Sequence, residues 1–138
     1  MGKWSLWVAC GLVIAFCWIA PGEAVAADMD GTAPILCAVV TVTECDRWGV
    51  CEPVDADVLG LPPFVRVDAG KKALEATDGS GRKTEIHTVA KENGRLLLQG
   101  GEKGRAWSLV IGQKAGEMTA AIADHDGGFI ISGTCTLP

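Results

Sequence analysis

Residues 95–135, RLLLQGGEKGRAWSLVIGQKAGEMTAAIADHDGGFIISGTC, decide the fold of this chain. Short runs of alternating apolar and polar residues recur here at intervals of roughly ten residues, with a glycine-bearing turn after each run, which is typical of an antiparallel meander. The runs are Arg95–Gln99, Arg105–Ile111, Glu117–Asp124 and Phe129–Cys135. We predict that each of them is a β-strand.

Alternation within these strands separates a core face from a solvated face. Side chains two residues apart share a face of a sheet, so the parity that carries the large apolar residues should face the core. The predicted core residues are Leu96, Leu98, Trp107, Leu109, Ile111, Met118, Ala120, Ile122, Phe129 and Ile131, joined by Val65, Val67 and Ile86. The opposite parity carries Ser, Thr, Gln and Arg side chains, which we expect to meet solvent.

The same pattern continues toward the N-terminus. Four further runs are rich in β-branched or alternating residues, and these are Ile35–Glu44, Phe64–Asp68, Lys72–Thr77 and Lys83–Ala90. Strong turn signals, such as Asn93-Gly94, separate them. The sequence therefore predicts an all-β fold, a small antiparallel barrel or flattened sandwich of about seven or eight strands.

The first 26 residues are predicted to be a secretory signal peptide. One positive charge precedes an apolar run over residues 4–20, and a small-residue cleavage site follows. We expect cleavage after Ala26 or Ala27, which leaves residues 27–138 as a single β domain. An uncleaved membrane anchor is the alternative, because the apolar run is about as long as the shortest membrane-spanning helices.

The composition restricts the cellular compartments and the kinds of partner that are possible for this chain. A signal peptide places the chain in the periplasm or outside the cell, and the bias toward Ala, Gly and Val with no Tyr suits a bacterial source. The net charge of −5 argues against nucleic acid or an anionic membrane surface as a partner. We expect no membrane association after the signal is removed.

Four cysteines follow the signal peptide, and an even number in a short exported chain indicates a disulfide framework. Three connectivities are possible, of which we favour Cys37 with Cys135 and Cys45 with Cys51. The first pair would join the first strand to the last, and the second would clamp a long loop around residues 45–61. In the chain-entropy model the long closure contributes about 4 to 5 kcal/mol and the short one about 2 to 2.5 kcal/mol.

The loop between Cys45 and Cys51 is the candidate partner-binding site. It contains Asp46, Arg47 and Trp48, and a rigidly held tryptophan is a common anchor of protein interfaces. Acidic residues around it would suit a basic partner. The competing interpretation, which we favour, is that Trp48 folds back and fills the end of a barrel whose core has few aromatic residues.

The catalytic residues available are few. We expect His87 to be an exposed strand residue and His125 to lie at a polar hairpin tip. A metal site formed by Asp124, His125 and Asp126 is a weaker alternative, because neighbours on a strand point to opposite faces. The sequence has no nucleophile elbow, Cys-x-x-Cys motif or phosphate-binding loop, so we predict no catalytic residue and no cofactor.

These patterns predict a non-enzymatic exported binding or accessory module. It would hold a small apolar ligand or present the Trp48 loop to another protein of the cell envelope. The alternative is a metal-binding protein or hydrolytic enzyme that uses His87, His125 and neighbouring carboxylates. That alternative requires the two imidazoles, or His125 with Asp124 and Asp126, to converge in a concave site.

Overall fold

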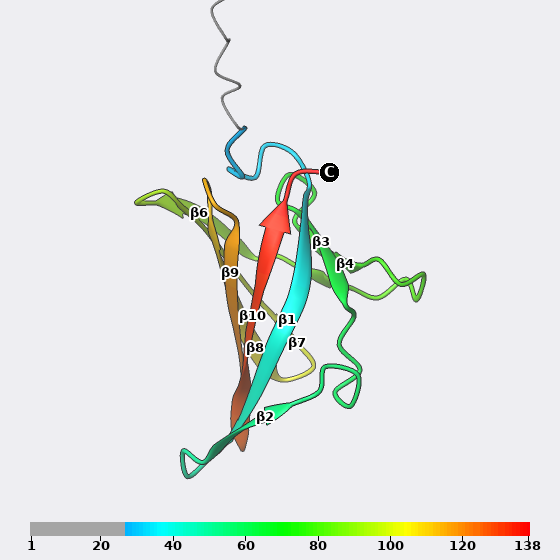
Figure 1. Cartoon of the computed structure of the whole chain (residues 1–138), viewed down its shortest axis with the longest axis vertical. Coiled ribbons are helices and arrows are strands. Elements are labelled where there is room, and N and C mark those ends of the chain that lie inside the picture. The colour runs from blue at the N-terminus through cyan, green and yellow to red at the C-terminus, as the bar shows by residue number, and fades with distance from the viewer. Residues whose placement is uncertain (1–26) are drawn as a thin grey trace, which may run out of the picture.

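The computed structural model describes residues 27–138, so the predicted signal peptide lies outside the described range. This part of the chain is all-β, and its ten antiparallel strands form one strongly curled sheet with the shape of a half-barrel (Figure 1). The strands are β1 (Ile35–Asp46), β2 (Cys51–Val54), β3 (Phe64–Asp68), β4 (Ala73–Ala76), β5 (Lys83–Glu85), β6 (Thr88–Glu92), β7 (Arg95–Glu102), β8 (Arg105–Gly112), β9 (Glu117–Asp124) and β10 (Gly127–Thr136).

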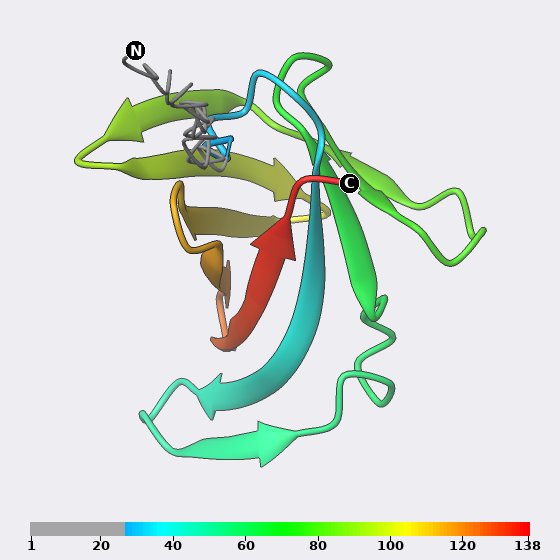
Figure 2. The ribbon, with the colours of Figure 1, turned by 45° about the horizontal axis from the view of Figure 1, so that its top comes forward.

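Strand β1 pairs with three other strands of the sheet. One edge pairs with β10 along almost its whole length, and the other edge pairs first with β3 and then with β2. The order continues from β10 through β9, β8 and β7 to β6, and from β3 through β4 to β5. The register shifts between Val39 and Thr41, and such a bulge bends a strand. The bend agrees with the curved path of β1 in Figure 2.

The two edge strands of the sheet, β5 and β6, follow each other directly in the chain. Strand β5 pairs with β4 and strand β6 pairs with β7, so the predicted strand Lys83–Ala90 is divided between both ends. The break falls at Ile86 and His87, whose backbone N–H groups donate to Lys72 and Gln99 carbonyls, each over 2.8 Å. Ile86 is fully buried. Its insertion into the core explains why the segment breaks there and curls the sheet.

The predicted core face is confirmed. Six of its residues are buried, namely Leu96, Leu98, Leu109, Ile111, Met118 and Ile131. The other four from the meander, Trp107, Ala120, Ile122 and Phe129, are partly buried and pack against them. Val67 and Ile86 also join the core, whereas Val65 is only half-buried.

Both predicted disulfides are present. Cys37 and Cys135 face each other across β1 and β10, and Cys45 faces Cys51 across β1 and β2. The first is buried and the second belongs to an exposed hairpin. Two disulfides indicate an oxidising environment. Within residues 27–138 we find no helix long and apolar enough to cross a membrane.

The expected loop over residues 45–61 is partly wrong. Strand β1 continues to Asp46 and Cys51–Val54 pairs with it as β2, so only the later part of the segment is irregular. The extra strand and the division at Ile86 raise the count from the predicted seven or eight to ten. Short strands that contain proline or charged residues lack the alternation on which the prediction depended.

One end of the curled sheet is closed by the segment before β1, which arches over it in Figure 2. Met29 is buried there, and its N–H donates to the Gln113 carbonyl over 2.8 Å. Gly31, at a φ of 81°, lets this segment pass close to Leu96. We call this the closed end. The opposite end, where the β1–β2 and β9–β10 turns lie, is called the open end.

Candidate functional site

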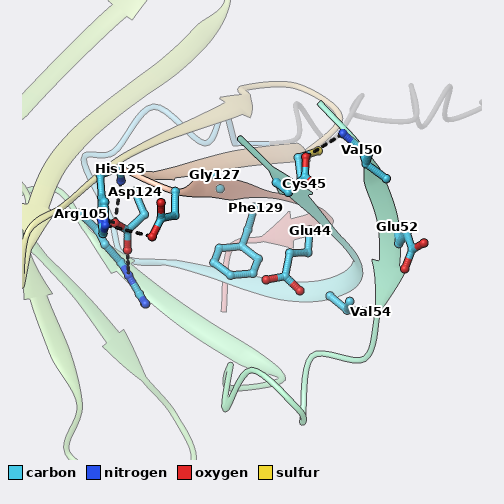
Figure 3. A pocket seen from close by; sticks show the side chains of 13 residues that line it. Glu44, Cys45, Val50, Glu52, Val54, Arg105, Asp124, His125, Gly127 and Phe129 are labelled. Atoms are coloured by element: carbon cyan, nitrogen blue, oxygen red, sulfur yellow. Dashed lines mark hydrogen bonds and ion pairs between the residues drawn. The ribbon is translucent and has the colours of Figure 1, made fainter. Parts of the chain in front are cut away.

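A pocket of about 490 Å³ lies at the open end, and its lining residues come from β1, β2, β8, β9 and β10 and from the β1–β2 and β9–β10 turns (Figure 3). Its size is in the range of small-molecule sites. In Figure 3, Phe129 and Glu44 lie side by side in the middle, with Arg105 and Asp124 on one side and Glu52 on the other. We call this the open-end pocket.

Strand register explains how charged residues come to line this pocket. A first row across the inner face is apolar, and it consists of Val54, Val42, Ile131, Ala120, Leu109 and Leu98. The next row toward the open end consists of Glu52, Glu44, Phe129, Ile122, Trp107 and Gly100. At the rim follow Asp46, Gly127, Asp124, Arg105 and Glu102. The inner face therefore changes from apolar to charged over two rows.

Glu44 and Glu52 distinguish the pocket from an ordinary barrel end. They are directly opposite each other on β1 and β2, a position at which the Cβ atoms of neighbouring strands are about 4.5 to 5.5 Å apart and like charges destabilise the sheet. In the part of the chain that the structure describes, neither carboxylate has an ion-pair partner. Glu44 also shares its face with the buried Val42 and with Phe129. Glu44 and Glu52 are both exposed, so their charges are accessible from solvent where they line the pocket.

A chain of ion pairs forms the other wall of the pocket. Arg105 Nε lies 3.0 Å from Asp124 Oδ2, and the hydrogen bond that it donates, followed by that of His125, holds the pKa of Asp124 below its usual value. His125 Nδ1 lies 2.6 Å from Asp124 Oδ1, and its Nε2 lies 2.9 Å from Asp126 Oδ2. Arg47, from the β1–β2 turn, pairs with Asp126. The two aspartates therefore already have cationic partners.

The candidate metal ligands Asp124, His125 and Asp126 lie together, but they contact one another. Both ring nitrogens of His125 face a carboxylate, and each carboxylate also faces an arginine. Across residues 27–138, no group of three or more His, Cys, Asp and Glu side chains is arranged to hold a metal ion.

His87 is not part of the open-end pocket. It lines a second, more open hollow of about 450 Å³, formed by residues from the end of β5 to the start of β8. Arg105 lines both hollows. The two histidines thus lie in different places and do not converge on one site.

The turn of the β1–β2 hairpin presents Trp48 to solvent. This side chain is 82% exposed, so the expectation that it fills the end of the barrel is wrong. Strand β1 pairs with β10 as far as Asp46 opposite Gly127, and the turn continues beyond that last pair, away from the core. Asp46 Oδ1 then accepts hydrogen bonds from the N–H groups of Trp48, over 2.8 Å, and Val50, over 3.0 Å. These bonds fix the turn that carries the tryptophan.

Sequence reasoning missed Glu44, Glu52 and Arg105 as residues of a site. Glu44 was placed at the end of the first predicted strand and Glu52 in an irregular loop, although the predicted disulfide indicates how the two residues pair. If Cys45 faces Cys51 across a hairpin, the residues beside them must also pair, and Glu44 then faces Glu52. Nothing local in the sequence indicates that Arg105 meets Asp124, because the contact depends on how β8 and β9 pair.

Comparisons with known proteins add no functional information. No protein-family model, no curated protein and no solved structure matches this chain significantly. A half-barrel fold by itself does not define a function. The function is therefore inferred from the open-end pocket.

Proposed function

We propose that this protein is an exported, non-enzymatic binding module of a bacterial periplasm, and that its open-end pocket holds a cationic group attached to an apolar body. An alkylammonium or alkylguanidinium group has this chemistry. The observation that carries the proposal is the pair Glu44 and Glu52, which face each other beside Phe129 with no cation partner among residues 27–138. The two disulfides support an oxidising compartment.

A bound cation would convert repulsion into attraction. At 4 Å and an effective dielectric constant of about 20, a carboxylate and a cation attract each other by about 4 kcal/mol. Desolvation and loss of ligand freedom offset much of this energy. A four-carbon alkyl chain against Phe129 and Val54 adds apolar contact. We expect a dissociation constant in the millimolar range, on the order of 1 mM, for such a small probe.

A hydrolytic or metal-dependent activity is the competing proposal, and the geometry supports it less well. Both His125 nitrogens already face carboxylates, so this imidazole is not free to activate a nucleophile. The residues that line the open-end pocket include no serine, threonine or lysine, and Cys45 is held in a disulfide.

The test is an NMR titration of ¹⁵N-labelled protein with n-butylammonium, with n-butanol as the neutral control. We expect butylammonium to shift the amide signals of Glu44, Glu52 and Phe129, with weaker binding at higher salt. Glu44→Gln and Glu52→Gln should each weaken binding about tenfold, which is about 1.4 kcal/mol. Glu92→Gln makes the same charge change on β6, outside the pocket, and should not affect binding.

Two results would overturn the proposal. The first is the absence of any shift in the pocket up to tens of millimolar butylammonium, roughly tenfold above the expected dissociation constant. The second is equal binding of butanol, because it would show that the pocket recognises the alkyl chain and not the charge.

A further inference from the structure

The turn of the β1–β2 hairpin, residues 47–50, continues the open-end pocket onto an apolar surface. We call these residues the hairpin tip. Trp48 is 82% exposed and Val50 is 59% exposed, and Val50 also lines the pocket. Pocket and hairpin tip therefore form one continuous surface, with carboxylates in the hollow and an aromatic ring beside it.

The hairpin tip is held in place from three sides. The Cys45–Cys51 disulfide closes its base, and Asp46 accepts two backbone hydrogen bonds across its turn. Arg47 pairs with Asp126 on the β9–β10 turn, which ties the hairpin to the opposite wall of the pocket. An aromatic residue on a fixed backbone loses little conformational freedom when it is covered, which favours binding.

We infer that the cation belongs to a partner protein, which inserts a lysine or arginine side chain into the open-end pocket while an adjacent apolar socket covers Trp48. This inference rests on the proposed function. Trp48 is not among the residues that line the pocket, so a small cation would leave it exposed. A protein is large enough to cover both, and fixed, exposed tryptophans are frequent anchors of protein interfaces.

Charge determines which kind of protein fits. Glu44, Asp46 and Glu52 surround the hollow beside the hairpin tip, and the nearby Arg47 is paired with Asp126. An acidic surface of this kind attracts a basic one and repels an acidic one. Strand addition to β2 is a poor alternative mode, because Pro53 lies in the middle of this short strand and has no N–H group to donate. Recognition therefore depends on side chains.

Photo-crosslinking of the full chain, produced in the organism that encodes it, tests this inference. The photoreactive residue p-benzoylphenylalanine replaces Trp48, and in a control it replaces Val58, which is 80% exposed and outside the pocket. A third variant combines the photoreactive residue at position 48 with Glu44→Gln and Glu52→Gln. Peptide mapping then locates the attachment point on the partner.

We expect one partner protein to be attached from position 48, at a segment that contains a lysine or arginine. The yield of this crosslinked product should fall about tenfold in the variant without the two glutamates. The variant with the photoreactive residue at position 58 should not form the product. No adduct from position 48, or an adduct that forms equally well without the glutamates, would overturn the inference. If butylammonium binds but no adduct forms, the inference fails while the proposed function stands; if neither is observed, both fail.

Discussion

At the scale of single residues, the proposed role of Glu44 in cation binding conflicts with its effect on stability. Its charge faces that of Glu52 across the β1–β2 ladder. Removal of one of two opposed like charges should stabilise the sheet, so we expect Glu44→Gln to raise the free energy of unfolding by about 0.2 to 1 kcal/mol while it weakens cation binding. Urea unfolding at neutral pH measures the change, with Glu85→Gln as the control, because Glu85 is exposed and is opposite Ala73 on β4. A loss of stability would show that Glu44 supports the fold instead.

Two loop aspartates contribute to the stability of the protein in acid. Hydrogen bonds from Thr32 lower the pKa of Asp30 to about 2, and hydrogen bonds from Ser80, followed by Arg82, lower that of Asp78 to about 2. Because these values lie below the ordinary value of 3.8, each carboxylate contributes stability that is complete above about pH 4 and is lost as the pH falls through about 2.

We therefore expect the free energy of unfolding to fall between about pH 4 and pH 2, and to fall less steeply in a variant that combines Asp30→Asn with Asp78→Asn. Urea unfolding at a series of pH values measures the slope. Asp57→Asn, at another exposed aspartate, is the control for the loss of one carboxylate. An equal slope in the double variant would mean that these hydrogen bonds do not persist in solution.

At the scale of the elements, the two disulfides have different effects. Cys37–Cys135 joins β1 to β10 over a sequence separation of 98, whereas Cys45–Cys51 closes one hairpin over a separation of 6. We expect paired Cys→Ala changes to lower the free energy of unfolding by about 4 to 5 kcal/mol for the first and about 2 kcal/mol for the second. Denaturant unfolding measures both, and equal losses would contradict the loop-length argument.

Regular elements could be predicted from the sequence, and irregular ones could not. Strand β9, with clean alternation, has the predicted bounds Glu117–Asp124. In β1 the bulge between Val39 and Thr41 exchanges the two faces, so Glu44 lies on the same face as Ile35, although alternation counted from Ile35 would place it on the other. The carboxylate pair of the pocket depends on this exchange. Alternation alone therefore could not have predicted the pocket.

The contacts that turns make with distant parts of the chain also could not be predicted from a local sequence pattern. Both disulfides followed from cysteine number and position, but the direction of Trp48 depends on how far β1 and β10 stay paired. The same holds for the division of Lys83–Ala90 at Ile86, which depends on the pairing of β5 with β4 and of β6 with β7. Such features arise from long-range pairing, which local propensity does not encode.

At the scale of the whole molecule, the two ends of the curled sheet differ in structure, and we expect them to act independently. Met29 packs into the core at the closed end, far in the strand register from the Glu52–Glu44–Phe129 row. We expect Met29→Ala to lower the free energy of unfolding by about 2 to 5 kcal/mol, because it leaves a cavity. Butylammonium binding at the open end should not change. If Met29→Ala also weakens butylammonium binding, measured under conditions where the variant is folded, the two ends are not independent.

The bridge between Cys37 and Cys135 has a consequence for survival among proteases. Because it joins positions 98 apart, nearly the whole domain is a covalent ring. A protease that cuts one exposed turn, such as residues 78–81, opens this ring without releasing a fragment. The two pieces remain joined, and such a nicked chain is expected to migrate as one band on a gel until the sample is reduced. A domain built in this way tolerates a first cut that would divide an unbridged chain in two.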